Sequence, residues 1–289
     1  MTMLAEHFVK PPEWTWYILT YFFLAGLSGG SYALGALLRL SRRPGYQAAA
    51  RLAFLAAFPL ILACPLLLTL DLGQPLRFWH MLFDSANLPA LNFKYWSPMS
   101  LGVWALSIYA AFAFVSFVEA LSSRVRRLLA GGLGAVVAVL GGALGLFVAA
   151  YTGVLLSVSN QPVWSDGWPL GGLFLASGLS GAAALLVLAA GYRPQLAEGV
   201  RALSEADRYF VAIEAVLVVM FLVTVALAGS LGKLFSGIIP LLWLFVVLGL
   251  AVPVVAHTRT RPILPLITSL LVLVGVLALR AAVIFGAQS

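Results

Sequence analysis

Residues Leu128–Asn160 read LLAGGLGAVVAVLGGALGLFVAAYTGVLLSVSN and contain no charged side chain. A membrane-spanning helix needs about 20 predominantly apolar residues, so this stretch alone is long enough to cross a bilayer. Similar uncharged runs occupy Trp14–Leu38, Leu52–Leu70 and Leu234–Ala256. Of the 289 residues, 62% are apolar and 9% are charged, against roughly 45–50% and about 25% in a soluble domain. Composition therefore predicts a polytopic membrane protein and excludes soluble enzyme folds.

The apolar runs predict eight transmembrane segments and an all-α fold. In lipid every backbone amide must be satisfied within its own segment, and the runs lack the alternation typical of barrel strands. The expected spans are residues 14–38, 48–70, 98–120, 129–157, 169–191, 209–231, 234–256 and 262–286.

Two stretches of sequence suggest an internal duplication. Phe23–Gly29 (FLAGLSG) matches Phe174–Gly181 (FLASGLSG) with one inserted residue, and four spans separate the two. Such spacing is typical of a parallel repeat, although small-residue composition alone can produce the same match. The hypothesis is two four-helix bundles, formed by residues 1–160 and 161–289.

Basic residues orient the spans. Twelve Lys and Arg residues lie in the connections on one side and four on the other, including the N-terminal segment. By the positive-inside rule both termini lie outside the cytoplasm, in a cell or inner membrane. The expected outer loops, 71–97 and 158–168, are long and aromatic. Their Trp residues indicate an interfacial belt, with a docking platform as the alternative.

Residue counts exclude several cofactors and partners. The single cysteine, Cys64, excludes a disulfide framework and cysteine-held clusters or zinc, and we expect it to be buried as a small apolar residue. Haem anchoring by two histidines needs ligands within helices, but His7, His80 and His257 lie in terminal or loop segments. The net charge of +7 resides in short loops, which indicates no nucleic-acid surface. We therefore expect no metal, haem or cluster in this chain.

Ionisable groups close to a span are candidate functional residues, because lipid penalises charge. Asp71 ends the second span and is followed by Arg77 and His80 in a short amphipathic segment. One interpretation is that these residues manage protons for a substrate dissolved in the membrane. The other is an interfacial salt bridge between Asp71 and Arg77 that fixes the loop.

Three further polar residues lie within spans. Tyr151 is about six residues, or roughly 9 Å, from the outer end of its helix, which places its hydroxyl near the depth of Asp71. Glu214 is embedded toward the cytoplasmic side and Arg280 toward the outer side. We consider both for a proton path, with a structural role for Arg280 as the alternative. From their depths they should not meet directly.

Four motifs resemble the NrfD/PsrC-like family, the membrane subunits of polysulfide reductase and related respiratory complexes. The similarity covers most of the chain and is specific in the first four helices. The motifs are Leu70–Gly73 with Pro75 and Arg77–Trp79, the glycine-rich stretch Leu24–Gly30, Ser97–Ser100, and Tyr151–Leu156 with Pro162.

The resemblance implies a subunit that binds a quinone, menaquinone or ubiquinone, near its extracytoplasmic face, in the first bundle. It would exchange electrons with a ferredoxin-like iron–sulfur subunit docked on the outer loops. That partner would in turn serve a catalytic subunit, typically a molybdopterin enzyme. Asp71 would act as acid/base and Tyr151 would hydrogen-bond the ring. Arg77 and His80 would tune Asp71 or connect it to water.

The first helix departs from the family pattern. Some family members carry a histidine beside the glycine-rich stretch, where this chain has Ser28 and Gly30. The hydroxyl of Ser28 or the close backbone at Gly30 would replace the imidazole, and Phe22, Phe23 and the third helix would form walls. The alternatives are a secondary transporter or ion-conducting protein, or a purely structural anchor. The chain would carry no catalytic centre beyond the quinone-reactive site.

Overall fold

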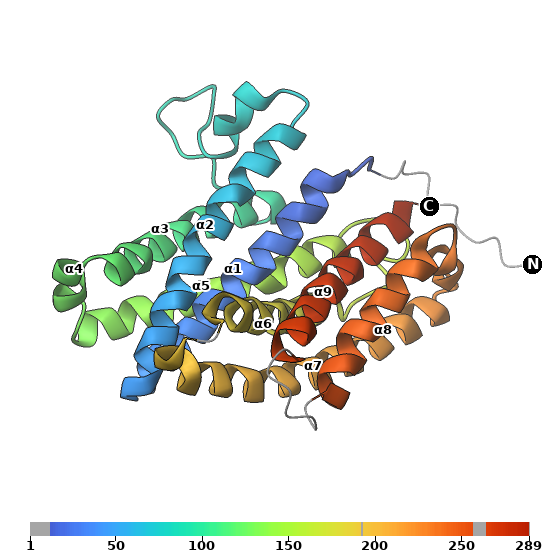
Figure 1. The fold of residues 1–289 in the computed structure, drawn as a ribbon. Coiled ribbons are helices and arrows are strands. Elements are labelled where there is room, and N and C mark those ends of the chain that lie inside the picture. The colour runs from blue at the N-terminus through green and yellow to red at the C-terminus, as the bar shows by residue number, and fades with distance from the viewer. Residues whose placement is uncertain (1–11, 192, 257–263, 289) are drawn as a thin grey trace, which may run out of the picture.

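Nine α-helices and four short 3-10 helices make up the described part of the chain. The computed structural model describes residues 12–191, 193–256 and 264–288. Within these ranges no β-strand forms, apart from an isolated bridge between Phe83 and Leu91. The helices are α1 (Trp16–Leu40), η1 (Pro44–Tyr46), α2 (Gln47–Asp71), η2 (Pro75–Met81), α3 (Pro98–Leu121), α4 (Ser123–Leu128), α5 (Gly132–Ser157), α6 (Leu170–Ala190), η3 (Pro194–Leu196), α7 (Ala197–Leu227), η4 (Leu231–Phe235), α8 (Ile239–Ala256) and α9 (Leu264–Gln288) (Figure 1).

Seven of these helices are long and apolar enough to cross a membrane, and α8 adds a shorter apolar helix, Ile239–Pro253. The prediction of an all-α, polytopic membrane protein is therefore confirmed. Several residues used in the sequence argument lie outside the described residues: His7, Lys10, His257, Arg259, Arg261 and the start of the last predicted span.

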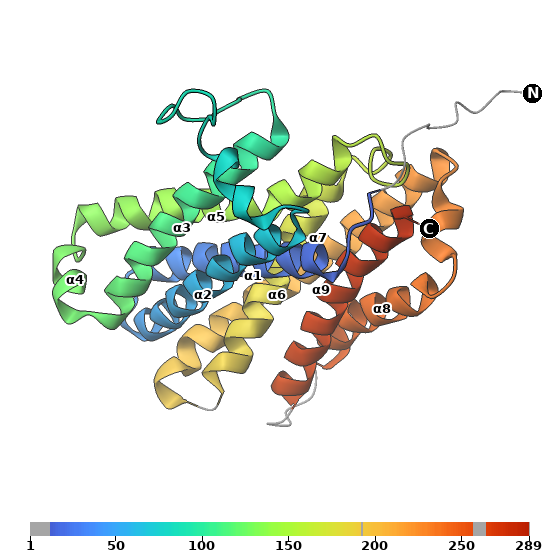
Figure 2. The ribbon, with the colours of Figure 1, turned by 90° about the horizontal axis from the view of Figure 1, so that it is seen from above.

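The helices leave two chemically different ends. The loop end carries residues 72–97 and 158–169, and the first of these segments projects from the helices in both views (Figure 1 and Figure 2). The arginine end carries the connection 41–46, which includes η1, and the connection 122–131, which includes α4.

Helices α1 and α6 form the centre of the bundle. Helix α1 packs against α2, α5, α6 and α9, and α6 packs against α1, α5, α7 and α9. The two similar glycine-rich stretches meet here, because a Cβ on Gly178 would lie 3.1 Å from the Gly26 carbonyl oxygen. Small residues permit such close approach between membrane helices. The halves 1–160 and 161–289 are thus in direct contact, and their division into two bundles stays a prediction.

Helix α7 begins at Ala197, well before the predicted start of the span at residue 209. The added turns are amphipathic. Leu203 is buried, whereas Arg201 and Glu205 are exposed and form an i,i+4 ion pair at 3.0 Å. Such pairs stabilise a helix that continues beyond the membrane, and a search for uncharged runs does not detect them.

Candidate functional site

A cavity of about 310 Å³ lies at the loop end between α1, α2, α3 and α5, with η2 beside it. Asp71 at the end of α2 and Tyr151 near the end of α5 both line it. Ligand pockets typically have volumes of about 300–1,000 Å³ and few polar groups. The structure therefore brings two of the predicted site residues to one apolar cavity of suitable size.

Helix α1 contributes one wall through residues at helical spacing. Ile18, Tyr21 and Phe22 line the cavity at i, i+3 and i+4, which is one face of α1, and Trp14 lines it from just before the start of the helix. The predicted wall residue Phe22 is therefore present. Phe23 instead packs in a separate cluster with Val272. Tyr21 was missed by the sequence reasoning, although its spacing from Trp14 could have revealed it.

Tyr151 is positioned by α3. Its hydroxyl donates a hydrogen bond to the carbonyl oxygen of Pro98, in the first turn of α3. Its ring lies against the backbone of Gly102, where any Cβ would collide with it, and it stacks on Phe147 with centroids 5.8 Å apart. The phenolic O–H is thus already used as a donor, while the lone pairs of the oxygen can still accept.

Asp71 is the last residue of α2, and the chain turns to an extended conformation at Leu72. Its side chain is partly exposed. Among the described residues it forms no ion pair with Arg77, so the predicted salt bridge is not formed. The carboxyl group is therefore left available to the cavity.

Ser28 and Gly30 do not line this cavity, in contrast to the expectation that they hold the quinone. The Ser28 hydroxyl is buried between helices, 2.7 Å from the Ala57 carbonyl to which it donates and 2.9 Å from the Tyr109 hydroxyl. Gly30 faces α6, and a Cβ there would lie 2.8 Å from that of Ala182. The orientation of α1 about its axis turns both residues toward neighbouring helices, where they serve packing.

Arg77 and His80 lie on η2 but do not line the cavity, whereas Phe78 and Met81 of the same turn do. Asn92 holds this segment through two hydrogen bonds. Its side-chain amide donates to the His80 carbonyl at 2.8 Å, and its backbone carbonyl accepts from Trp104 Nε1 at 3.2 Å. η2 is thereby tied to α3 beside the cavity.

The loop beyond η2 is ordered by Asp84. Its carboxylate accepts hydrogen bonds from the Ala86 N–H and the Asn87 side chain, both at 3.0 Å. These donors stabilise the charged form, and they hold the pKa of the Asp84 carboxyl below its usual value. The loop therefore carries a fixed negative charge.

The second loop is joined to the cavity wall by two tryptophans. Trp164 stacks on Trp14 with centroids 4.9 Å apart, and its Nε1 donates to the Val283 carbonyl at 2.8 Å. Trp164 is only 1% exposed, so it is a core residue rather than a member of the predicted interfacial belt. Trp168, at 66% exposed, is free to fill the belt role.

Glu214 and Arg280 are both buried in the second half of the chain, and the structure records no ion pair between them among the residues it describes. Arg280 Nε donates to the Phe22 carbonyl and Nη2 to that of Phe174, both at 3.2 Å. Its Nη1 donates to Ser177 Oγ at 2.9 Å. Arg280 therefore joins α1, α6 and α9, and Gly26 leaves the space that its guanidinium occupies.

No group of three or more His, Cys, Asp or Glu side chains suited to a metal ion occurs in the described ranges. Cys64 is buried and free. The cavity instead combines apolar walls with the carboxyl of Asp71 and the side chains of two tyrosines, Tyr21 and Tyr151. This donor set fits a flat, uncharged ring that bears oxygen atoms.

Fold and cavity together define a multi-pass helical membrane protein with a ligand-sized cavity at one end. A family model described as "Polysulphide reductase, NrfD" matches residues 6–289, and the chain belongs to this family.

The chain resembles several named proteins over different lengths. One of the chains of the polysulfide reductase of Wolinella succinogenes is 28% identical over 313 residues, which covers 96% of the present sequence and 94% of that protein. A protein NrfD homolog of Haemophilus influenzae is 27% identical over 320 residues, covering 95% and 94%. One of the subunits of the selenate reductase of Mesobacillus selenatarsenatis is 28% identical over 107 residues, covering 37% of the present sequence and 22% of that protein.

Proposed function

We propose that this protein is the membrane subunit of a respiratory oxidoreductase and that it binds a quinone or quinol in the loop-end cavity. The observation that carries the proposal is that Asp71 and Tyr151, from α2 and α5, line the same apolar cavity. Two of the relatives are named as components of a polysulfide reductase and of a selenate reductase, which supports membership of such a complex.

The two polar residues have complementary roles. A bound quinol supplies two electrons and two protons when it is oxidised. Because Tyr151 donates its own proton to the Pro98 carbonyl, its oxygen accepts a hydrogen bond from a ring hydroxyl and orients the ring. Asp71 would accept the two protons one after the other at its carboxylate and release each at the surface, while the two electrons would pass to the partner subunit at the loop end. The resting arrangement of Tyr151 therefore suits a quinol better than a quinone.

Access from the membrane is provided at the edge of the cavity. Met99 and Phe78 line the cavity and are also 57% and 50% exposed. A hydrophobic ligand dissolved in lipid would enter between these side chains, while the apolar walls of α1 and α3 exclude water. Arg77 and His80, on the adjacent η2, would carry protons between Asp71 and solvent.

The partner would bind at the loop end. Exposed aromatic side chains gather there, among them Tyr95, Trp96 and Trp168, and aromatic residues are enriched in protein interfaces. We assign this face to an iron–sulfur subunit that passes electrons to or from a catalytic subunit of molybdopterin type. Under the positive-inside rule this face, with both termini, is extracytoplasmic.

In this proposal Glu214 and Arg280 have different roles. The donors of Arg280 are used on carbonyls and Ser177, which favours a bracing role. Glu214, a buried carboxyl on α7, retains the role of proton carrier. Glu214→Gln should then lower the number of protons moved per electron in liposomes without slowing quinol oxidation; an unchanged ratio would remove Glu214 from the path.

The site assignment is tested by quinol-dependent electron transfer in the purified complex. Asp71→Asn should slow transfer about 100-fold, because a positioned acid/base contributes at least that much. Tyr151→Phe should slow it about tenfold through loss of one hydrogen bond.

Matched controls are Glu205→Gln and Tyr209→Phe, which make the same kinds of chemical change at exposed positions of α7 outside the cavity. Both should leave the rate unchanged, and all four variants should copurify with the partner subunits. Normal turnover in both the Asp71 and the Tyr151 variants would refute the assignment.

A further inference from the structure

A second cavity lies at the arginine end, between α1, α2, α3 and the start of α5, and it has a volume of about 670 Å³. It shares no lining residue with the loop-end cavity. The charged residues that line it are four arginines and one glutamate: Arg39, Arg42, Arg51, Arg126 and Glu119.

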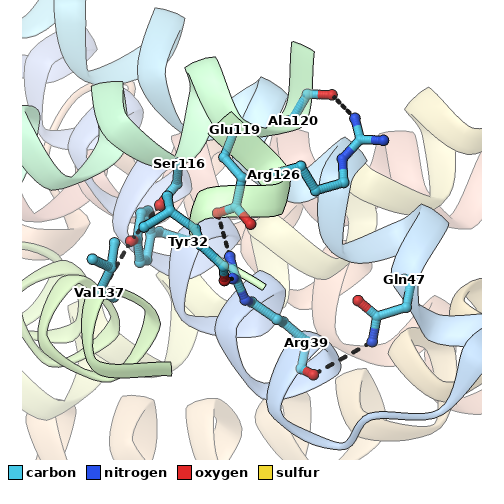
Figure 3. A network of polar contacts seen from close by, with 9 residues as sticks. Tyr32, Arg39, Gln47, Ser116, Glu119, Ala120, Arg126 and Val137 are labelled. Atoms are coloured by element: carbon cyan, nitrogen blue, oxygen red, sulfur yellow. Dashed lines mark hydrogen bonds and ion pairs between the residues drawn. The ribbon is translucent and has the colours of Figure 1, made fainter. Parts of the chain in front are cut away.

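The negative charge of Glu119 is already balanced by the positive charge of Arg39. Glu119 is buried and forms an ion pair with Arg39 (Figure 3). Arg39 Nη2 also donates to the Leu129 carbonyl at 2.7 Å. Within the described residues, no carboxylate pairs with Arg42, Arg51 or Arg126. Three positive charges therefore remain around the cavity without a counter-charge.

Arg126 provides an independent indication of a missing acceptor. Its Nη2 donates to the Ala120 carbonyl at 2.8 Å (Figure 3), while its Nε is buried and has no hydrogen-bond partner. A buried donor without an acceptor is costly, and more so when it is charged. The site thus lacks a negatively charged or carbonyl-type oxygen.

The backbone at this cavity also attracts negative charge. Gly131 is the N-cap residue of α5 and offers no side chain to cap the helix. A Cβ on Gly131 or Gly132 would meet nothing within 4 Å, so the first turn of α5 borders open space. The free N–H groups and the positive end of the dipole of a 26-residue helix favour an anion there.

Two exposed leucines lie at and beside the cavity. Leu40 lines the cavity and is exposed, and α4 beside it presents Leu128, which is 75% exposed. A ligand seated here would have its charged group among the arginines and its remainder in the lipid.

We propose that the arginine-end cavity binds the phosphate group of an anionic phospholipid from the leaflet at that end. Arg51, Arg126 and the first turn of α5 would hold the phosphate oxygens, and the acyl chains would lie along Leu40 and Leu128. Basic pockets between membrane helices on the cytoplasmic side are known to take anionic headgroups. The proposal is independent of quinone binding at the loop end.

Binding to the full complex, stripped of lipid in detergent, tests the proposal. The probes are dioleoyl phosphatidylglycerol, dioleoyl phosphatidylcholine and inorganic phosphate, with bound lipid counted by native mass spectrometry. Phosphatidylglycerol should bind at least tenfold more tightly than phosphatidylcholine. The double variant Arg51→Gln/Arg126→Gln should abolish this preference.

The control is Arg201→Gln, at an exposed arginine that does not line the cavity, and it should bind phosphatidylglycerol as the unaltered protein does. Arg42→Gln is a milder single change at an exposed position and should weaken phosphatidylglycerol binding severalfold. It tests the proposal even if the double variant does not fold. Equal binding of both lipids, or an unaffected double variant, would overturn the proposal. Displacement of the lipid by millimolar inorganic phosphate would identify a free phosphate as the ligand and overturn the lipid assignment.

Discussion

The same four helices, α1, α2, α3 and α5, form both cavities, yet the two ends have opposite chemistry. The loop-end cavity has apolar walls with one carboxyl and two tyrosines, whereas the arginine-end cavity has four guanidinium groups and one carboxylate. The first suits a neutral ring and the second an anion. Under the two proposals both ligand sites lie at helix ends, whereas residues further along α1 such as Ser28 and Gly30 serve packing.

The largest effect should come from breaking the buried ion pair at the arginine end. Glu119→Gln leaves the partly buried Arg39 without its charged partner, which should cost about 3 kcal/mol of unfolding free energy. Thermal unfolding of the purified complex measures this loss.

The matched control is Glu205→Gln, which removes the same charge from the exposed pair with Arg201. It should cost about 0.5 kcal/mol or less, as is usual for surface pairs. Equal losses in the two variants would mean that the Arg39–Glu119 pair is not important to the arginine end.

An intermediate effect is expected when a methyl group is added behind Tyr151. In Gly102→Ala the new Cβ would collide with the Tyr151 ring, which must shift at a cost of about 1–3 kcal/mol. Quinol-dependent electron transfer should slow, with normal lipid binding at the arginine end. The control is Gly73→Ala, where an added Cβ would meet no atom within 4 Å. A normal electron-transfer rate in Gly102→Ala would show that the position of the Tyr151 ring is unimportant.

The smallest effect should follow a change in the link between the halves. Trp164→Phe removes the Nε1 hydrogen bond to the Val283 carbonyl, worth about 1 kcal/mol, and weakens the stacking on the cavity residue Trp14. We expect a slightly lower melting temperature and a higher quinol KM. The control Trp168→Phe, at an exposed position, should change neither the melting temperature nor the quinol KM. A normal quinol KM in Trp164→Phe would show that quinol binding does not depend on the stacking of Trp164 on Trp14.

The placement of Asp71 and Tyr151 could be predicted because both depend on helix depth. The number of residues to a helix end determines depth, and apolar runs reveal where helices end. Rotation about the helix axis is harder to predict, which is why Ser28 and Gly30 were assigned to the cavity although they face neighbouring helices. Only the Trp14–Tyr21 spacing carried information on rotation.

The arginine-end cavity could not be predicted for a related reason. In the sequence Arg39, Arg42, Arg51 and Arg126 are loop charges that orient the chain, and nothing indicates that Glu119 pairs with the first of them. This grouping depends on how α1 and α3 pack. The start of α7 was likewise hidden, because its stability there comes from side-chain pairs such as Arg201–Glu205.

The position of the last residues of α9 has a practical consequence for anyone labelling this protein. Gln288 Oε1 accepts a hydrogen bond from the Trp14 N–H at 2.9 Å, so the carboxyl-terminal helix ends next to a wall of the loop-end cavity. A fluorescent or affinity tag placed directly after α9 would lie beside this contact and would compete for space with any docking subunit. Insertion into the turn before η3, at the opposite end, avoids that crowding.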